Sequence, residues 1–123
     1  MGVKITALVP TATNDRVVAG LETGEIVVYL VGSGINVTTL RGHTDAVRAI
    51  ASGQEPRWWI TGSDDCSLRL WDIKEERCAA VLHGHASPVR AVCLFPNMSL
   101  VASSGLDSSA RLWGLEWELS VFG

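Results

Sequence analysis

The chain has 123 residues, of which 47% are hydrophobic and 19% charged, a composition that excludes a disordered chain. Its formal net charge of −3 excludes the basic field that attracts nucleic acid or an anionic membrane. No apolar run approaches the roughly 20 residues of a membrane helix, and the three cysteines fit neither a zinc site nor a disulfide framework. We therefore expect an intracellular protein, cytoplasmic or nuclear.

Taken in chain order, the sequence predicts short β-strands separated by turn residues, and no window of useful length has a helical period. The strands are clearest in the middle of the chain, where β-branched and aromatic residues lie between segments with turn chemistry. There the predicted strands span residues 46–51, 57–62, 67–72 and 77–82. A last strand is expected at residues 117–122.

The predicted strands belong to a repeat with a spacing of 42 residues. Gly42-His43 aligns without a gap with Gly84-His85, and Arg69-Leu70-Trp71 aligns with Arg111-Leu112-Trp113. A fainter copy lies upstream, where Tyr29 stands at the position of the first of these tryptophans. The three copies cover residues of about 3–41, 42–83 and 84–123.

The dipeptides at the two ends of each clear copy carry a family resemblance. Gly42-His43 followed by Trp71-Asp72, and Gly84-His85 followed by Trp113-Gly114, resemble the signature of the WD40 repeat family. The resemblance implies an all-β fold, a single domain of three four-stranded antiparallel propeller blades with a degenerate first blade. Propellers have roughly four to eight blades, so this one is incomplete unless the chain oligomerises or is part of a larger chain. Two chains could close a six-blade ring as a homodimer, or the remaining blades could come from a larger chain or a partner.

In this family a buried hydrogen-bond network joins the His of Gly-His, a Ser or Thr on the second strand, the Asp of the next turn and the Trp of the third strand. Carried over by position, the resemblance implies two structural tetrads: His43, Thr61, Asp65 and Trp71 in the second blade, and His85, Ser103, Asp107 and Trp113 in the third. In the first blade Ala19, Thr23 and Tyr29 replace three members. We therefore expect that blade to depend on apolar packing and to be the least stable.

The same residue types also occur in hydrolase triads, and His85, Ser103 and Asp107 could be read as one. The structural interpretation is better, because the set recurs in two copies at one spacing. His83 and His85 could be read as a metal pair, but no carboxylate or thiol stands at ligand spacing from them. We expect no enzyme activity, no metal and no cofactor.

Proteins of this family usually bind partners on the top face of the propeller, through residues beside the structural network. The matching positions here are Lys4, Thr6 and Glu22 in the first blade, Ala46, Arg48 and Asp64 in the second, and Pro88, Arg90 and Leu106 in the third. Arg48 and Arg90 repeat at one spacing, and arginine pairs well with carboxylates, so an acidic peptide is the first candidate ligand. The alternative is that both arginines face water or bind the neighbouring Asp64.

The main functional prediction is a non-enzymatic scaffold that docks partner proteins or peptides on the top face. The segment 60–74 also resembles the box of WD40 substrate receptors in cullin-type ubiquitin ligases. It departs from that box at Trp59, where an aliphatic residue is usual, and at Lys74, where arginine is usual. The alternative prediction is a substrate-receptor or accessory subunit of such an enzyme complex.

Overall fold

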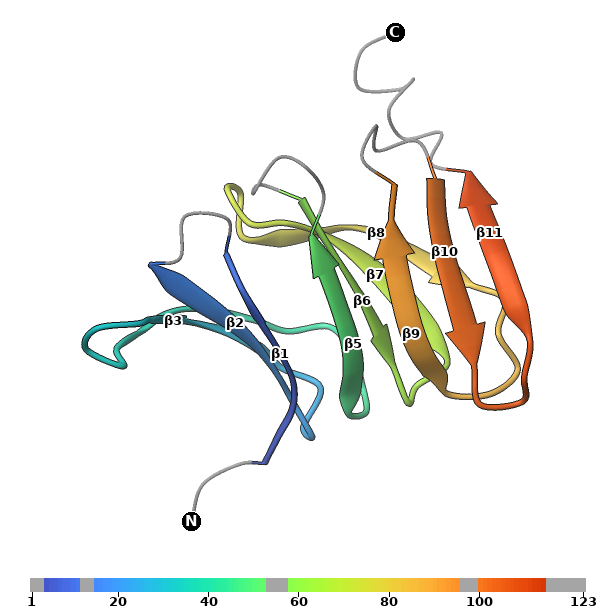
Figure 1. The fold of residues 1–123 in the computed structure, drawn as a ribbon, viewed down its shortest axis with the longest axis horizontal. Helices are drawn as coiled ribbons and strands as arrows, with labels where there is room; N and C mark the ends of the chain where they lie inside the picture. Colours follow the sequence, from blue (N-terminus) through green and yellow to red (C-terminus); the bar gives the residue numbers. More distant parts are fainter. Residues whose placement is uncertain (1–3, 12–14, 53–57, 96–99, 115–123) are drawn as a thin grey trace, which may run out of the picture.

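The computed structural model describes residues 4–11, 15–52, 58–95 and 100–114. These residues form three antiparallel β-sheets that stand side by side, like neighbouring blades of a propeller (Figure 1). The predicted all-β class and the antiparallel pairing are confirmed. In the part of the chain that the structure describes, no helix has the length and hydropathy that a membrane crossing requires.

Each sheet is built from strands that are consecutive in the chain. The first contains β1 (Ile5–Pro10), β2 (Arg16–Leu21), β3 (Ile26–Leu30) and β4 (Asn36–Leu40). The second contains β5 (Val47–Ser52), β6 (Trp58–Ser63), β7 (Ser67–Asp72) and β8 (Arg77–His83). The third contains β9 (Val89–Leu94), β10 (Leu100–Gly105) and β11 (Ala110–Gly114). The strand predicted at residues 117–122 lies outside the described residues.

All three sheets have the same turn between their second and third strands. Gly24, Cys66 and Ser108 stand at equivalent positions of this turn and have positive φ angles of 93°, 72° and 71°. The backbone N–H of each donates to the carbonyl three residues earlier, at 3.0, 3.1 and 3.2 Å. Glycine adopts this conformation freely, whereas Cys and Ser adopt it at a cost. Three different sequences therefore form one turn geometry.

The hydrophobic core lies between neighbouring sheets. One buried cluster joins the first and second sheets, and its members are Val18, Ile26, Val28, Leu40, Val47, Trp59 and Trp71. A second cluster joins the second and third sheets, and its members are Ile60, Leu68, Leu70, Val89, Leu94 and Val101. Trp59 packs in the first cluster and the half-buried Trp58 packs against the second, because successive side chains of a strand point to opposite faces.

Glycine allows a close approach between neighbouring sheets. A Cβ atom placed on Gly20 would lie 2.6 Å from Val47 Cγ1, and one placed on Gly62 would overlap Val89 Cγ1. The third sheet has Ser104 at this position, and the first sheet has Ile5 at the position of the two valines. A ring closed by two copies of the chain would therefore bring Ile5 towards Ser104, a contact unlike the two within the chain.

Replacing Gly62 with Ala should lower the free energy of unfolding by about 1–3 kcal/mol, because the added methyl group overpacks the contact with Val89. Gly32→Ala is the matched control, since a Cβ atom there would meet no other atom within 4 Å. Urea unfolding followed by tryptophan fluorescence measures both. Equal stability of the two variants would contradict the close approach.

Candidate functional site

A buried hydrogen-bond relay lies at one end of the second sheet. Thr61 on β6 is its centre, because its Oγ1 accepts the indole N–H of Trp71 at 2.7 Å and lies 2.7 Å from His43 Nε2. His43 precedes β5, and its Nδ1 lies 2.8 Å from Asp65 Oδ2 in the turn between β6 and β7. The structure thus brings together the four residues of the expected tetrad.

The donors and acceptors of this relay fit one proton arrangement. A carboxylate can only accept, so we assign the His43 proton to Nδ1, which donates to Asp65. His43 Nε2 is then an acceptor, and the Thr61 hydroxyl donates to it while accepting from Trp71. Burial lowers the pKa of His43, opposed by Asp65 and assisted by the positive charge of Arg69, and a neutral imidazole is what the relay needs.

Asp65 holds the turn as well as the imidazole. Its carboxylate accepts hydrogen bonds from the backbone of Thr44 at 3.0 Å, from the backbone of Ser67 at 2.8 Å and from the Ser67 hydroxyl at 2.6 Å. Burial raises the pKa of Asp65, but the hydrogen bonds from Ser67 and His43 outweigh burial and lower the pKa to about 2. Asp65 is therefore ionised at any physiological pH.

The third sheet has the same relay with one difference. Ser103 Oγ accepts the indole N–H of Trp113 at 2.8 Å and lies 2.7 Å from His85 Nε2. His85 Nδ1 faces Ser109 Oγ at 3.2 Å, and the Asp107 carboxylate accepts from the backbone of Ser109 at 3.0 Å. In this sheet the imidazole therefore faces a serine hydroxyl, whereas in the second sheet it faces both a carboxylate and a serine hydroxyl.

Sequence reasoning missed Ser67 and Ser109 as members of these networks. Ser67 Oγ lies 3.3 Å from His43 Nδ1, as Ser109 Oγ lies 3.2 Å from His85 Nδ1. The signal was present, because the two serines are 42 residues apart, the spacing of the repeat.

The first sheet replaces the relay with apolar contacts. Ala19, Leu21 and Val27 are buried together, and Tyr29 packs against them. Leu21 and Val27 stand where the second sheet has Ser63 and Arg69. This agrees with the expectation that the first sheet depends on apolar packing.

Neither relay presents an open reactive group. Thr61 is 1% exposed and Ser103 is 5% exposed, so both residues are buried in the blades. Among the described residues there is no group of three or more His, Cys, Asp or Glu side chains that could hold a metal ion. The arrangement can order a turn and a loop, which is structural chemistry.

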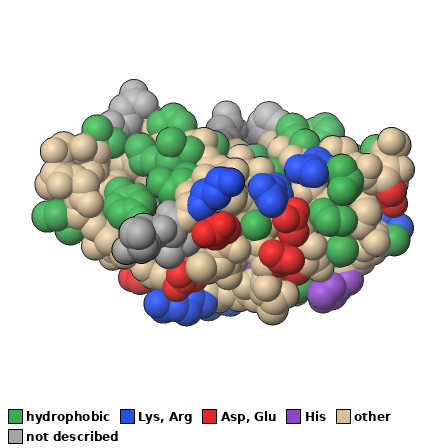
Figure 2. Space-filling view, turned by 90° about the horizontal axis from the view of Figure 1, so that it is seen from below, with side chains coloured by type: hydrophobic (Ala, Val, Ile, Leu, Met, Phe, Trp, Pro, Cys, Tyr) green, Lys and Arg blue, Asp and Glu red, His purple; other side chains and the backbone are tan. Residues whose placement is uncertain are grey.

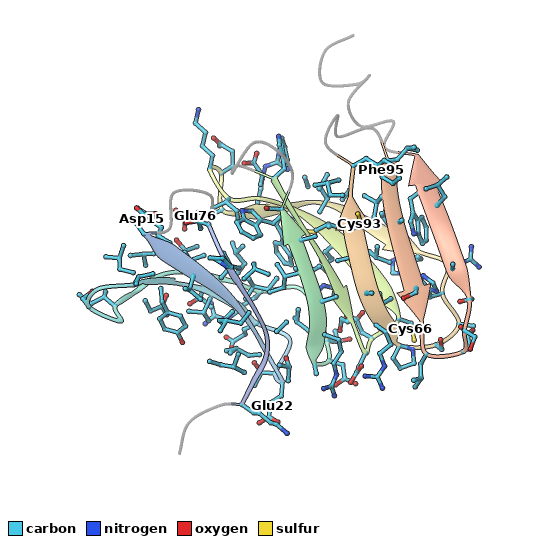
Figure 3. The ribbon with its side chains drawn as sticks, in the orientation of Figure 1. Asp15, Glu22, Cys66, Glu76, Cys93 and Phe95 are labelled. Carbon is cyan, nitrogen blue, oxygen red and sulfur yellow. The ribbon has the colours of Figure 1, made fainter. Side chains whose placement is uncertain are left out.

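The residues expected to bind partners gather at the end of the sheets that carries the turns after β2, β6 and β10, called the turn end below. Glu22 and Cys66 mark this end in Figure 3, while Asp15, Glu76 and Phe95 mark the opposite end. One backbone hydrogen bond of 2.9–3.0 Å recurs in each sheet, from Glu22 N to Lys4 O, Asp64 N to Ala46 O and Leu106 N to Pro88 O. Ala46 is 4% exposed, so its side chain is closed to a partner.

The innermost strand of each sheet has a β-bulge at the turn end. Between β5 and β6, Val47 pairs with Ser63 and Ala49 pairs with Gly62, so Arg48 is the extra residue. The same irregularity leaves Thr6 as the extra residue of β1 and Arg90 as that of β9. A bulge redirects a side chain, and these bulges recur beside one another because β1, β5 and β9 are neighbours (Figure 1).

The two arginines have different surroundings. Arg48 donates to Asp64 Oδ2 from Nε at 3.0 Å and from Nη2 at 2.9 Å. Arg90 has Leu106 at the corresponding position, and it makes no ion pair with any residue that the structure describes. Figure 2 looks onto the turn end and shows basic side chains beside acidic ones across the middle of this face.

The family model "WD domain, G-beta repeat" matches residues 34–72 and 76–114. The chain belongs to the WD40 repeat family. Each matched segment contains the outermost strand of one blade and the three inner strands of the next, β4 with β5–β7 and β8 with β9–β11. A WD40 repeat of this chain is therefore shared between two blades, so covalent continuity links each blade to its neighbour.

The WD40 proteins that resemble this chain include proteins with different names. The chain is 38% identical to the pre-mRNA-splicing factor PRP46 of Candida albicans over 80 residues, 63% of this chain and 21% of that protein. It is 34% identical to the probable E3 ubiquitin ligase complex SCF subunit sconB of Aspergillus oryzae over 103 residues, 68% of this chain and 15% of that protein. It is 32% identical to mouse Striatin-4 over 85 residues, 66% of this chain and 11% of that protein. The chain thus spans about a fifth or less of these relatives.

A solved structure supports the propeller arrangement. The structure of U3-55K superposes with a TM-score of 0.85 and 18% sequence identity, over 95% of this chain and 38% of that chain. At this identity the likeness concerns the fold alone. The three WD40 blades therefore form an arc of a propeller.

Replacing Asp65 with Ala should lower the free energy of unfolding by about 1–3 kcal/mol, because a buried imidazole and the turn amides lose their acceptor. Asp107→Ala is the matched control and should cost less, since Asp107 is exposed and water can replace it. Chemical denaturation measures both. A stable Asp65→Ala variant that has lost partner binding would contradict the structural role.

Acidification should lower the free energy of unfolding. The pKa of His43 is lowered in the folded state from its usual 6.5, so its stabilising contribution is complete above that pH and is lost as the pH falls through the lowered value. Asp65 acts in the same direction between about pH 4 and 2. Urea unfolding at pH 7, 6 and 5 tests the first part. His43→Gln should flatten this dependence relative to the exposed His83→Gln, and equal dependence would contradict it.

Proposed function

We propose that this chain is a non-enzymatic interaction scaffold that docks partner proteins or peptides on its turn end. The observation that carries the proposal is the repeated bulge, which places the side chain of one inner-strand residue per blade, Thr6, Arg48 or Arg90, at this end. The relays of the second and third blades hold the neighbouring turns, so the exposed side chains of Arg48 and Arg90 stand on a rigid support. In the first blade, which has no relay, the half-buried Thr6 hydroxyl donates to the backbone carbonyls of Gly20 and Val47. Relatives whose names place them in splicing and in a ligase complex support a role in assemblies.

The double variant Arg48→Glu with Arg90→Glu should lose its partners without losing its fold, because both side chains are exposed. Its matched control is Arg16→Glu with Arg77→Glu, which changes charge equally at the starts of β2 and β8, at the opposite end. Affinity capture from cells, compared by quantitative mass spectrometry, measures the partners. Partners lost equally from both variants, or retained by both, would contradict docking at the turn end.

A substrate receptor of a cullin-type ubiquitin ligase is the second candidate, and the similarity to the SCF subunit favours it. In the box-like segment, Ile60 and Trp71 are buried in blade packing, whereas Lys74 is exposed at the opposite end. An adaptor would therefore have to contact the Lys74 end. In the same capture experiment, a ligase adaptor that is retained by the double variant but lost with Lys74→Glu would favour this candidate.

A further inference from the structure

We propose that the third blade carries the recognition position of the turn end, and that Arg90 and Leu106 together bind an Asp or Glu of a partner peptide next to an apolar residue. This inference rests on the proposed scaffold function and names the chemistry of its partner. It follows from a comparison of equivalent positions in the second and third blades, where the bulge and the backbone hydrogen bond recur and Leu106 replaces Asp64.

In the second blade, the positive charge of Arg48 is neutralised by an acidic side chain of the same chain. Asp64 accepts two hydrogen bonds from Arg48, and this pair, with Asp45 and Glu22 at greater distance, raises the pKa of the guanidinium. An incoming carboxylate would have to displace Asp64 and approach three acidic side chains. Like charges disfavour such an approach, so Arg48 is a poor anchor for an acidic ligand.

The third blade has the same backbone hydrogen bond, but an apolar side chain stands where the second blade has a carboxylate. Leu106 N donates to Pro88 O at 2.9 Å, as Asp64 N donates to Ala46 O, so Leu106 stands where the second blade has its carboxylate. Arg90 occupies the bulge of β9, is exposed, and has no ion pair with any described residue. Its guanidinium is therefore available for a bidentate contact with a carboxylate.

Leu106 indicates which side chain of the ligand should lie next to its carboxylate. It is 56% exposed, and the half-buried Pro88 lies beside it. An apolar side chain of the ligand would cover both while the neighbouring acid reaches Arg90. A peptide offers this combination, whereas an inorganic anion or a nucleic-acid phosphate offers charge alone.

Random heptapeptides displayed on phage and selected on the immobilised chain provide the probe, and the most enriched peptide is then titrated calorimetrically. We expect Asp or Glu next to Leu, Ile, Val or Phe in the selected sequences. Arg90→Gln should weaken binding at least about tenfold, and Arg48→Gln less than about twofold. Replacing the acid of the peptide with its amide should weaken binding as Arg90→Gln does.

A reciprocal exchange makes the test specific. Leu106→Asp should close the position by giving Arg90 the intramolecular partner that Arg48 has, with a loss again of at least about tenfold. Asp64→Leu should free Arg48 in the second blade and let a second peptide bind there, more weakly than at Arg90 because Asp45 and Glu22 remain near Arg48. The Asp64 side chain bonds only Arg48 among the described residues, so this change should leave the unfolding midpoint unaltered.

The outcomes separate this inference from the function on which it rests. If Arg48→Gln weakens binding as much as Arg90→Gln does, or if Leu106→Asp has no effect, the assignment to the third blade is wrong while docking at the turn end stands. If no peptide is selected, or if the selected peptides bind the Arg48→Glu, Arg90→Glu double variant unchanged, the proposed function fails as well.

Discussion

The buried hydroxyl of Thr61 is the interaction on which the second blade depends. It receives the indole of Trp71 and bonds the imidazole of His43, so one oxygen atom joins β6, β7 and the loop that arrives from the first blade. Each of these polar groups is buried and would cost free energy without a partner. Ser103 has the same role in the third blade. The relay therefore fixes how one blade follows another, and apolar packing between the sheets can then close to van der Waals contact.

The first blade shows what the relay contributes beyond strand pairing. Its turn has Gly24 at the position of positive φ, where no side chain opposes the conformation. Cys66 and Ser108 occupy that position in the other blades at a cost of about 1 kcal/mol each. In both blades an aspartate of the turn accepts the backbone N–H of the residue two positions later, Ser67 or Ser109. Glycine in one blade and a carboxylate in the others are thus two solutions to the same backbone requirement.

Features that depend on one repeat at a time could be predicted from the sequence. The strands and the relay residues follow from residue types at a fixed spacing, because each copy carries the same local pattern. The bulges could not be predicted, since they depend on the register between two strands, and the close approach of Gly62 to Val89 depends on two sheets. The repeat predicts equivalent places for Arg48 and Arg90, whereas their different surroundings depend on the residue across the turn, which is Asp64 in one blade and Leu106 in the other.

At the turn end, two adjacent residues have different roles: one stabilises the turn and the other is available for recognition. Asp65 points inward and holds the turn, whereas Asp64, one residue earlier, points outward and contacts only Arg48 through its side chain among the described residues. In the third blade the exposed Asp107 still accepts the backbone N–H of Ser109, and Leu106 replaces the outward residue, while the backbone hydrogen bond to the residue before the innermost strand is unchanged. Because the inward residue carries the geometry, the outward residue can be acidic or apolar without loss of the turn. In this way each copy of a repeated blade can present a different surface. Here the second blade presents an arginine paired with Asp64, and the third presents an arginine without an ion pair among the described residues.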